Sequence, residues 1–148
     1  MKSAVILLAI LSLICGISSN GKIMKTIINT NHAPAPIGPY SQAVMVNGML
    51  YVSGQVPINP TTGEVINGSI QEETKQVMEN LKAILEAAGM DFTHVVKTTI
   101  FLEDMDNFKH VNEIYGSYFT RDFPARETVE VSRLPKDVNV EISVIAAK

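Results

Sequence analysis

Two stretches of the sequence carry apolar residues at helical spacing, each along one side only. At the start of the first, residues 69–89, Ser69 and Glu72 can form a capping box in which each side chain satisfies a free backbone N–H of the other. Its apolar stripe consists of Ile70, Val77, Met78, Leu81, Ile84, Leu85 and Ala88. The second stretch, residues 106–121, has a similar stripe. Since each helix can bury only one side, we expect both to pack on one face of a sheet.

Strand-like segments surround these two helices. They are expected at residues 25–29, 43–46, 50–56, 94–102, 128–134 and 140–146. The dipeptide Asn47-Gly48 is the strongest short signal for a hairpin turn, so the second and third segments should pair. The order of strands and helices predicts an α+β fold, in which a mixed β-sheet carries both helices on the same face.

Composition limits the number of domains and the class of partner. The chain has 148 residues, of which 46% are hydrophobic, and this suits one domain with a sizeable core. The formal net charge is −3 and there is no basic block, so nucleic acid and anionic membrane surfaces are not expected partners. The three histidines, His32, His94 and His110, lack the spacing of metal ligands, and no metal site is expected.

The first residues differ from the rest of the chain. Lys2 precedes an apolar run at residues 4–15, and small and polar residues follow, which is the layout of a secretory signal peptide. The run is shorter than the roughly 20 residues of a membrane span, so no stable membrane anchor is expected. Residues 1–19 are therefore a signal peptide that favours export to the periplasm or the outside, or an extension from a mis-assigned start before Met24. The working domain is residues 24–148.

Strand alternation predicts a second, more polar face of the sheet. Successive side chains of a strand point to opposite faces, so Val129 and Val131 are expected under the helices. The polar residues assigned to the other face are Ser53, Gln55, Arg126, Thr128, Glu130 and Glu141. This face is either simply solvated, as in many antiparallel sheets, or covered by a partner subunit with its polar groups turned toward a ligand.

Four motifs in fixed order resemble the Rid (YjgF) family. They are GPYSQA at 38–43, YVSGQVP at 51–57, FPAR at 123–126 and VEVSRLPKDVNVEISVIA at 129–146. The most similar subgroup is RidA, the enamine/imine deaminases, and the resemblance runs from about Met24 to Ala147. It implies a chorismate-mutase-like fold and a homotrimer with three sites in clefts between subunits.

The resemblance also implies a reaction. RidA proteins hydrolyse 2-iminopropanoate and 2-iminobutanoate, which arise from reactive enamines such as 2-aminoacrylate, to 2-oxo acids and ammonia, without a metal or organic cofactor. Arg126 matches the family arginine, and a planar, always-charged guanidinium suits the carboxylate of an imino acid. Glu141 matches the family glutamate that orients the attacking water.

The same resemblance assigns the other site residues. Tyr40 matches a tyrosine whose hydroxyl reaches the ligand, and Ser53 and Gly54 match the strand segment that lines the pocket. Thr128 stands where many members have cysteine, and its hydroxyl can still form a hydrogen bond. Glu127 departs from the usual small residue, and strand alternation is expected to point it away from Arg126.

A second reading of the same family is a non-catalytic trimer. Members have also been described as small-ligand-binding, regulatory or chaperone-like proteins, and a pocket without turnover would favour that class. Export also bears on the choice, because the lyases that release enamines are usually intracellular.

Overall fold

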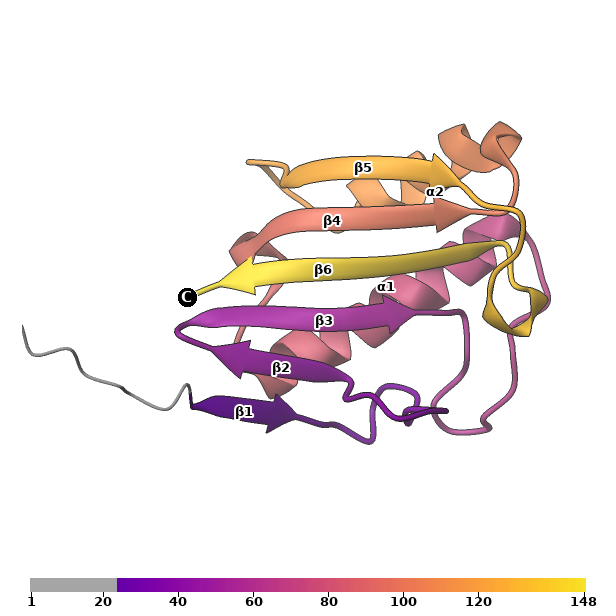
Figure 1. Ribbon diagram of the computed structural model, residues 1–148. Coiled ribbons are helices and arrows are strands. Elements are labelled where there is room, and N and C mark those ends of the chain that lie inside the picture. The colour runs from indigo at the N-terminus through magenta and orange to yellow at the C-terminus, as the bar shows by residue number, and fades with distance from the viewer. Residues whose placement is uncertain (1–23) are drawn as a thin grey trace, which may run out of the picture.

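The computed structural model describes residues 24–148, and the leader predicted at residues 1–19 lies outside them (Figure 1). The strands are β1 (Lys25–Ile28), β2 (Ala43–Val46), β3 (Met49–Gln55), β4 (Val95–Leu102), β5 (Ala125–Glu130) and β6 (Val140–Ala147). The helices are α1 (Ile70–Ala87) and α2 (Phe108–Gly116), with short 3₁₀ turns at Phe92–His94, Met105–Asn107 and Pro135–Asp137. Within residues 24–148, neither helix has both the length and the apolarity of a membrane span.

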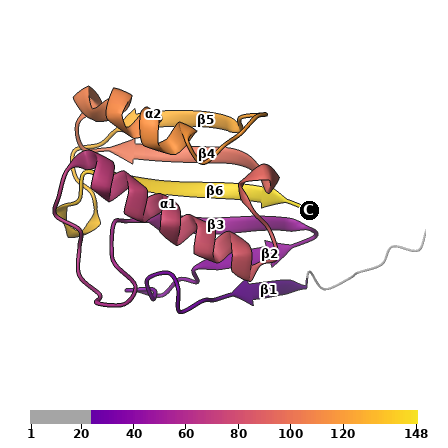
Figure 2. The same ribbon diagram turned by 180° about the vertical axis from the view of Figure 1, so that it is seen from behind.

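All the strands form one sheet in the order β1-β2-β3-β6-β4-β5. Strands β4 and β5 are parallel and the other pairs are antiparallel, so the sheet is mixed as predicted. The last strand, β6, is inserted between β3 and β4 at the centre of the sheet. Both helices cover the same face, with α2 behind β4 and β5 and α1 beside it, and the other face is open (Figures 1 and 2). The predicted α+β architecture is confirmed.

The capping box and the apolar stripe of α1 are present as the sequence predicts. The Ser69 N–H donates to Glu72 Oε2 at 2.7 Å, and the Glu72 N–H donates to Ser69 Oγ at 3.3 Å. The stripe forms the centre of the core, where Val77, Met78, Leu81, Ile84 and Leu85 are fully buried. Because burying each such side chain stabilises a fold by about 1.5–3 kcal/mol, the stripe fixes α1 on the sheet.

The helix predicted at residues 106–121 is shorter in the structure. A 3₁₀ turn precedes α2, which ends at Gly116. Tyr115 and Phe119 are nevertheless buried, because their rings pack together with centroids 4.8 Å apart. The residues after the helix therefore keep the predicted contact with the core without helical geometry.

Strand β5 reverses the faces that alternation predicted. It begins at Ala125, and its register with β4 places Arg126 opposite Thr98 and Thr128 opposite Ile100. Thr98 and Ile100 are fully buried on the helix side. Arg126 and Thr128 therefore point to the helix side of the sheet, and the prediction that they lie on the second face is wrong.

The physical reason is that β5 is an outer strand. Apolar residues of a central strand must face the core, but Val129 of β5 lies on the open face and is 43% exposed. Glu130 lies on the helix side, where its Oε2 accepts a hydrogen bond from the Met105 N–H at 2.8 Å. Alternation divides a strand into two sets of residues, but at a sheet edge it does not decide which set faces the core.

A bulge in β3 changes a second predicted face. The pairing of β3 with β6 shifts between Val52 and Gln55, so both of these residues are buried on the helix side. Gln55 was predicted on the open face and is only 5% exposed. Ser53 and Gly54 occupy the irregular segment between them. A bulge of this kind re-aims side chains and is common beside active sites.

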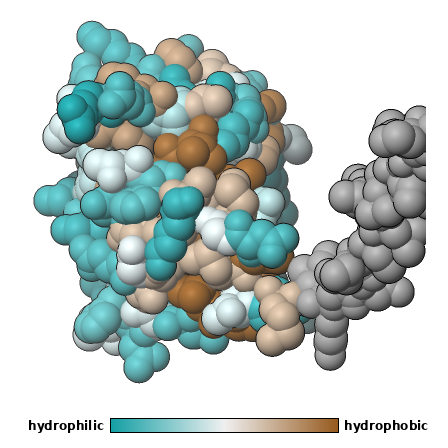
Figure 3. All heavy atoms as spheres, turned by 90° about the vertical axis from the view of Figure 1, so that its left-hand side faces the viewer, coloured by the Kyte–Doolittle hydropathy of each residue, from teal (hydrophilic) through white to brown (hydrophobic). Residues whose placement is uncertain are grey.

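The open face is less polar than predicted. One row across the sheet carries Ile27, Val44, Tyr51, Ile145 and Lys97 in register. Tyr51 is 47% exposed and Ile27 is 42% exposed. At the end of the molecule that carries the C-terminus, apolar residues lie as separate spots among polar ones (Figure 3). Exposed apolar rows framed by polar residues are typical of surfaces that contact a partner.

Candidate active site

Five of the six predicted site residues lie in two pockets that share no residue, and Thr128 lines neither of them. The Glu141 pocket has a volume of about 270 Å³ and is lined by Ile37, Tyr40, Ser53, Gly54, Val56, Pro135 and Glu141. The Arg126 pocket has a volume of about 450 Å³ and is lined by Asn112, Tyr115, Gly116, Phe123, Pro124 and Arg126. Sequence alternation predicted Arg126 and Glu141 on the same face. That prediction is wrong, because the two side chains point to opposite faces of the sheet.

Glu141 projects from the central strand β6 onto the open face. Its neighbours Val140 and Ile142 are fully buried on the other side, so its direction is fixed by the strand. The carboxyl lies against Gly54, where a Cβ atom would overlap it. Burial raises the pKa of Glu141, and no hydrogen bond or ion pair from the described residues offsets this desolvation. A carboxyl with a raised pKa is suited to exchanging protons with a substrate.

Tyr40 stands on the loop between β1 and β2 at the mouth of the Glu141 pocket. The residue is 47% exposed, and its hydroxyl accepts a hydrogen bond from the Ile37 N–H at 3.3 Å. The loop is shaped by Gln42, which is 3% exposed. The Gln42 side-chain amide donates to the backbone oxygens of Ala33 and Pro34 at 3.2 and 2.8 Å. Gln42, the glutamine of the GPYSQA motif, therefore holds this loop in its conformation, a role that we did not predict.

Ser53 joins this loop to β3. Its hydroxyl donates to the Ser41 backbone oxygen at 2.7 Å, and its N–H donates to the Gln42 oxygen at 3.0 Å. The Ser53 proton is thus already engaged, and the hydroxyl faces the pocket as an acceptor. Ser53 and Gly54 both line the Glu141 pocket, and the substrate-binding role that the resemblance implies for them stays a prediction.

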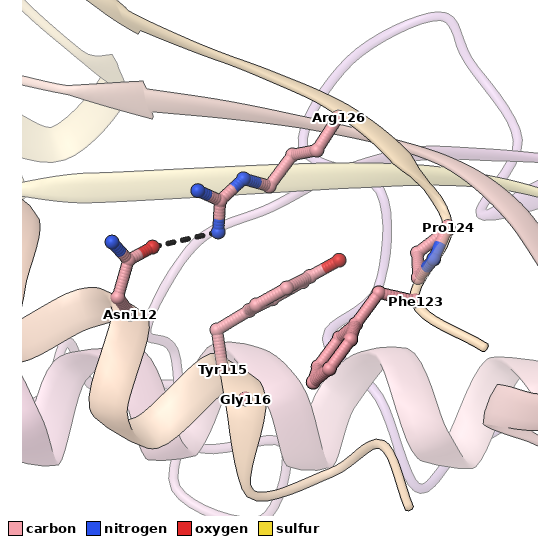
Figure 4. Close-up of a pocket in the computed structure, with 6 residues that line it drawn as sticks. All are labelled: Asn112, Tyr115, Gly116, Phe123, Pro124 and Arg126. Atoms are coloured by element: carbon pink, nitrogen blue, oxygen red, sulfur yellow. Dashed lines mark hydrogen bonds between the residues drawn. The ribbon is translucent and has the colours of Figure 1, made fainter. Parts of the chain in front are cut away.

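Arg126 reaches from β5 across the Tyr115 ring to α2 (Figure 4). Its Nη1 donates to Asn112 Oδ1 at 2.6 Å. Its Cζ lies 5.1 Å from the ring centroid of Tyr115 and 5.6 Å from that of Phe108, which is cation–π distance. Helix α2 therefore orients the guanidinium with three side chains at helical spacing. Most of its five N–H donors form no hydrogen bond to another residue of the described range 24–148.

Asn112, Phe108 and Tyr115 were not predicted as site residues. Phe108 and Tyr115 belong to the apolar side of the second predicted helix, and this pattern predicts core residues. The spacing of 108, 112 and 115 places all three on one side of a helix. That spacing was visible in the sequence, but nothing in it indicated that Arg126 would face this helix rather than the open face.

Two further hydroxyl groups line the region around Arg126. The Tyr115 hydroxyl donates to Thr98 Oγ1 at 3.1 Å, and burial raises the pKa of Tyr115 although Thr98 and the Arg126 charge act in the opposite direction. Thr128 Oγ1 is shielded from solvent and has no hydrogen-bond partner among the described residues. A buried hydroxyl without a partner is costly unless water or a ligand satisfies it.

Glu127 points away from Arg126, as alternation predicted. On the open face it forms an ion pair with Lys97 and accepts a hydrogen bond from Thr99 Oγ1 at 2.6 Å. These two contacts lower the pKa of Glu127. It therefore does not compete with a carboxylate for the guanidinium within its own subunit.

Residues 30–148 match the family described as Endoribonuclease L-PSP. A RutC family protein of Pyrococcus horikoshii is 54% identical over 125 residues, which cover 84% of this chain and 99% of the relative. Human 2-iminobutanoate/2-iminopropanoate deaminase is 48% identical over 124 residues, which cover 84% of this chain and 90% of the relative. The crystal structure of E. coli TdcF with bound serine has a TM-score of 0.80 at 41% identity, covering 83% and 98% of the two chains. The chain belongs to the Rid (YjgF) family.

This Rid-family chain has the fold that its motifs implied. Its two pockets divide the motif residues between them, since Tyr40, Ser53, Gly54 and Glu141 lie together and Arg126 lies apart. Among residues 24–148, no three acidic, histidine or cysteine side chains are placed to hold a metal ion. The two pockets offer a guanidinium, a carboxyl group with a raised pKa and several hydroxyls.

Proposed function

We propose that this chain is a 2-iminobutanoate/2-iminopropanoate deaminase, which hydrolyses small 2-imino acids to 2-oxo acids and ammonia. The observation that carries the proposal is the oriented guanidinium of Arg126, which lines a pocket and has donors that no other residue of 24–148 engages. A planar cation in that state fits the carboxylate of an imino acid. The name of the human relative, at 48% identity, supports the same activity.

The proposed reaction needs one anchor and one proton-transfer group. Arg126 binds the substrate carboxylate, and Glu141 orients a water molecule that attacks the C=N carbon. The water gives up a proton and its oxygen bonds to the carbon, which forms a carbinolamine. The nitrogen takes up the protons that it needs to leave as ammonia, and the carbon becomes the carbonyl of the 2-oxo acid. Glu141 accepts and returns these protons, and its raised pKa favours this role.

The proposal requires the two pockets to meet between subunits. Arg126 and Thr128 lie on the outer strand β5, and Glu141 lies on the open face, so one subunit cannot place both on the same substrate. In a homotrimer, Arg126 of one subunit would face the Glu141 pocket of the next. The exposed apolar residues Tyr51 and Val129 support a covered open face, and the unpartnered Thr128 hydroxyl supports a ligand beside Arg126.

A coupled assay tests the activity. A pyridoxal-phosphate lyase generates 2-aminoacrylate, which tautomerises to 2-iminopropanoate, and release of the 2-oxo acid is followed with and without the protein. We expect micromolar protein to accelerate hydrolysis over the spontaneous rate. Unchanged oxo-acid release at that concentration would contradict the proposal.

Mixing two inactive variants tests whether the site is shared. Arg126→Ala lacks the anchor and Glu141→Gln lacks the proton-transfer group, and each should be inactive alone. If equal amounts are unfolded and reassembled together, random association gives intact Arg126–Glu141 pairs at about one site in four. Activity should then return to about a quarter of the wild-type value. A mixture that stays inactive although mixed trimers form would mean that each site belongs to one subunit.

The second candidate is a small-ligand-binding trimer without turnover. It is favoured by the bound serine in the E. coli TdcF structure, which is a ligand of that protein with a carboxylate and an amino group. The two candidates differ in one measurement. Calorimetric binding of pyruvate or serine that depends on Arg126, together with no acceleration of imine hydrolysis, would select the binding protein.

A further inference from the structure

A strained turn borders the Glu141 pocket. It connects β5 to β6, and within it Lys136 and Asp137 have φ angles of 64° and 55°. This left-handed region is unfavourable for residues with a Cβ atom, and such residues persist only where the surroundings hold them. The preceding Pro135 lines the Glu141 pocket. The conformation of the turn therefore determines one wall of that pocket.

The two ends of the turn are fixed by burial. Leu134 is 7% exposed and Val138 is 2% exposed. Across the turn, Arg133 Nε donates to Asp137 Oδ1 at 2.6 Å, but both of these side chains are exposed. An exposed ion pair contributes little to holding a strained backbone. The restraint must come mainly from the buried side of the turn.

Glu73 provides that restraint from the start of α1. It is 2% exposed, its Oε2 accepts from the Asn139 N–H at 3.0 Å, and its Oε1 accepts from Asn139 Nδ2 at 2.6 Å. The positive end of the helix dipole also stabilises a carboxylate in this first turn. The start of α1 and the β5–β6 turn lie at the same end of the sheet (Figure 1). Both oxygens of this buried carboxylate thus accept hydrogen bonds from one residue, Asn139.

Asn139 transmits this restraint to the pocket. Its backbone oxygen accepts from the Glu103 N–H at 3.1 Å, so it is held on both sides. It follows the strained turn directly and precedes Val140, the first residue of β6. We propose that Glu73 is a positioning residue for the Glu141 pocket, which it shapes by holding Asn139 and the strained turn. This inference rests on the proposed deaminase function, and Glu73 itself does not line the pocket.

Glu73→Gln is the principal test. Both Asn139 groups are donors, so a glutamine amide must place its own NH₂ against one of them and lose that contact. We expect kcat for 2-iminopropanoate to fall about tenfold, because small misplacements of reacting groups have large effects on rate. KM should stay within about twofold, because Arg126 still binds the carboxylate. Ile84→Val, a core change in the same helix, is the control for a comparable loss of Tm.

A second substitution separates positioning from general stability. Glycine adopts positive φ without strain, so Lys136→Gly should let the turn keep its shape without Glu73. In the Glu73→Gln background it should restore most of kcat, while in the wild type it should change kcat by less than about twofold. No recovery in the double variant would overturn the proposal. Equal losses of kcat in Glu73→Gln and Ile84→Val would also overturn it.

Amide hydrogen exchange tests the restraint without any assay of activity. In Glu73→Gln, exchange at residues 134–141 should become faster while exchange in α2 stays unchanged. If Glu73→Gln does not fold, Asn139→Ala removes only the side-chain contact and should give a smaller effect of the same kind. Unchanged exchange in a folded variant overturns the proposal even if the protein is an active deaminase. Faster exchange in a protein without deaminase activity would refute the proposed function and leave the restraint standing.

Discussion

The Arg126 and Glu141 pockets hold their charged groups in opposite ways. The guanidinium is oriented by a hydrogen bond to Asn112 and by the Tyr115 ring before any ligand is present. The Glu141 carboxyl lies against Gly54 without such a partner among residues 24–148, and burial raises its pKa. An anchor gains from being fixed in advance, whereas a proton-transfer group gains from a pKa nearer to neutrality.

Loss of the anchor should have the largest effect. Arg126→Ala removes two charge-assisted hydrogen bonds to the substrate carboxylate, each contributing about 1.5–3 kcal/mol, so kcat/KM should fall roughly 10²- to 10⁴-fold. Arg126→Lys keeps the charge but not the planar pair of donors, and it should recover only a small part of this loss. Steady-state kinetics of imine hydrolysis measures both variants. Wild-type kcat/KM in Arg126→Lys would mean that charge alone is sufficient and that orientation by α2 is irrelevant.

Loss of the proton-transfer group should have an effect nearly as large, but this effect should be on kcat. Glu141→Gln keeps the size of the side chain and removes its ability to exchange protons, so kcat should fall roughly 10²- to 10⁴-fold. KM should change little, because the carboxylate is still bound by Arg126. A variant in which KM rises and kcat is unchanged would reassign Glu141 to substrate binding.

The same variant should be more stable than the wild type at neutral pH. The folded-state pKa of Glu141 is raised above its ordinary value of 4.5, so the folded state favours the neutral acid. In the wild type, the contribution of Glu141 to the free energy of unfolding is therefore most favourable below that ordinary value, where the carboxyl is neutral in both states. This favourable contribution is lost as the pH rises through the folded-state pKa. Glutamine is neutral at every pH, so the gain in Tm should be present at neutral pH and absent below the ordinary pKa. Thermal melting at both pH values measures it.

Much of the fold follows from local sequence patterns. The capping box of Ser69 and Glu72, the stripe of α1 and the Asn47-Gly48 turn predict elements that the structure contains. These signals depend either on residues close together in the chain or on an apolar stripe along one side of a helix. Both can be recognised in the sequence. The predicted faces of β5 were wrong because an outer strand does not have to bury its valines. The bulge at Ser53 and Gly54 depends on pairing with β6, which lies far away in the chain.

The motifs point to individual residues of the candidate site but do not predict their arrangement. The motifs identified Arg126 and Glu141, and the structure places each in a pocket. Their separation depends on which face of β5 meets α2, and that is decided by the packing of the whole sheet. Asn112 was missed for the same reason, because its role requires Arg126 to be on the helix side. Glu73 and Asn139 are distant in sequence, and no local pattern connects them.

Gly54→Ala should disturb only the Glu141 pocket. A Cβ atom there overlaps the Glu141 carboxylate, whose flexible end must move to make room. Displacing a reacting group by about 1 Å can cost up to about a hundredfold in rate, so we expect a loss in kcat of about tenfold to a hundredfold. Binding of pyruvate to the Arg126 pocket, measured by calorimetry, should be weakened far less than turnover. Equal losses in both would mean that Gly54 also shapes the binding of the carboxylate by Arg126.

Asn112→Ala should weaken the anchor without removing it. The hydrogen bond from Arg126 Nη1 is lost, but the Tyr115 and Phe108 rings still hold the guanidinium. A single hydrogen bond of this kind contributes about 1 kcal/mol, so KM should rise about fivefold while kcat changes little. Ser117→Ala, on an exposed residue just after the same helix, is the matched control. An unchanged KM in Asn112→Ala would show that the rings alone orient the arginine.

Glu127→Gln should have the smallest effect, although it changes the charge of the residue beside Arg126 in the chain. Its contacts to Lys97 and Thr99 lie on the open face, so kcat and KM should both stay within about twofold of the wild type. Those contacts lower the folded-state pKa of Glu127, so their contribution to stability is present above its ordinary value of 4.5 and is lost as the pH falls through the folded-state pKa. Melting temperatures should therefore show a small deficit at neutral pH that disappears in acid. A lower KM in Glu127→Gln would mean that this carboxylate reaches an arginine in the assembled protein and competes with the substrate, so that the two faces of β5 act on one site.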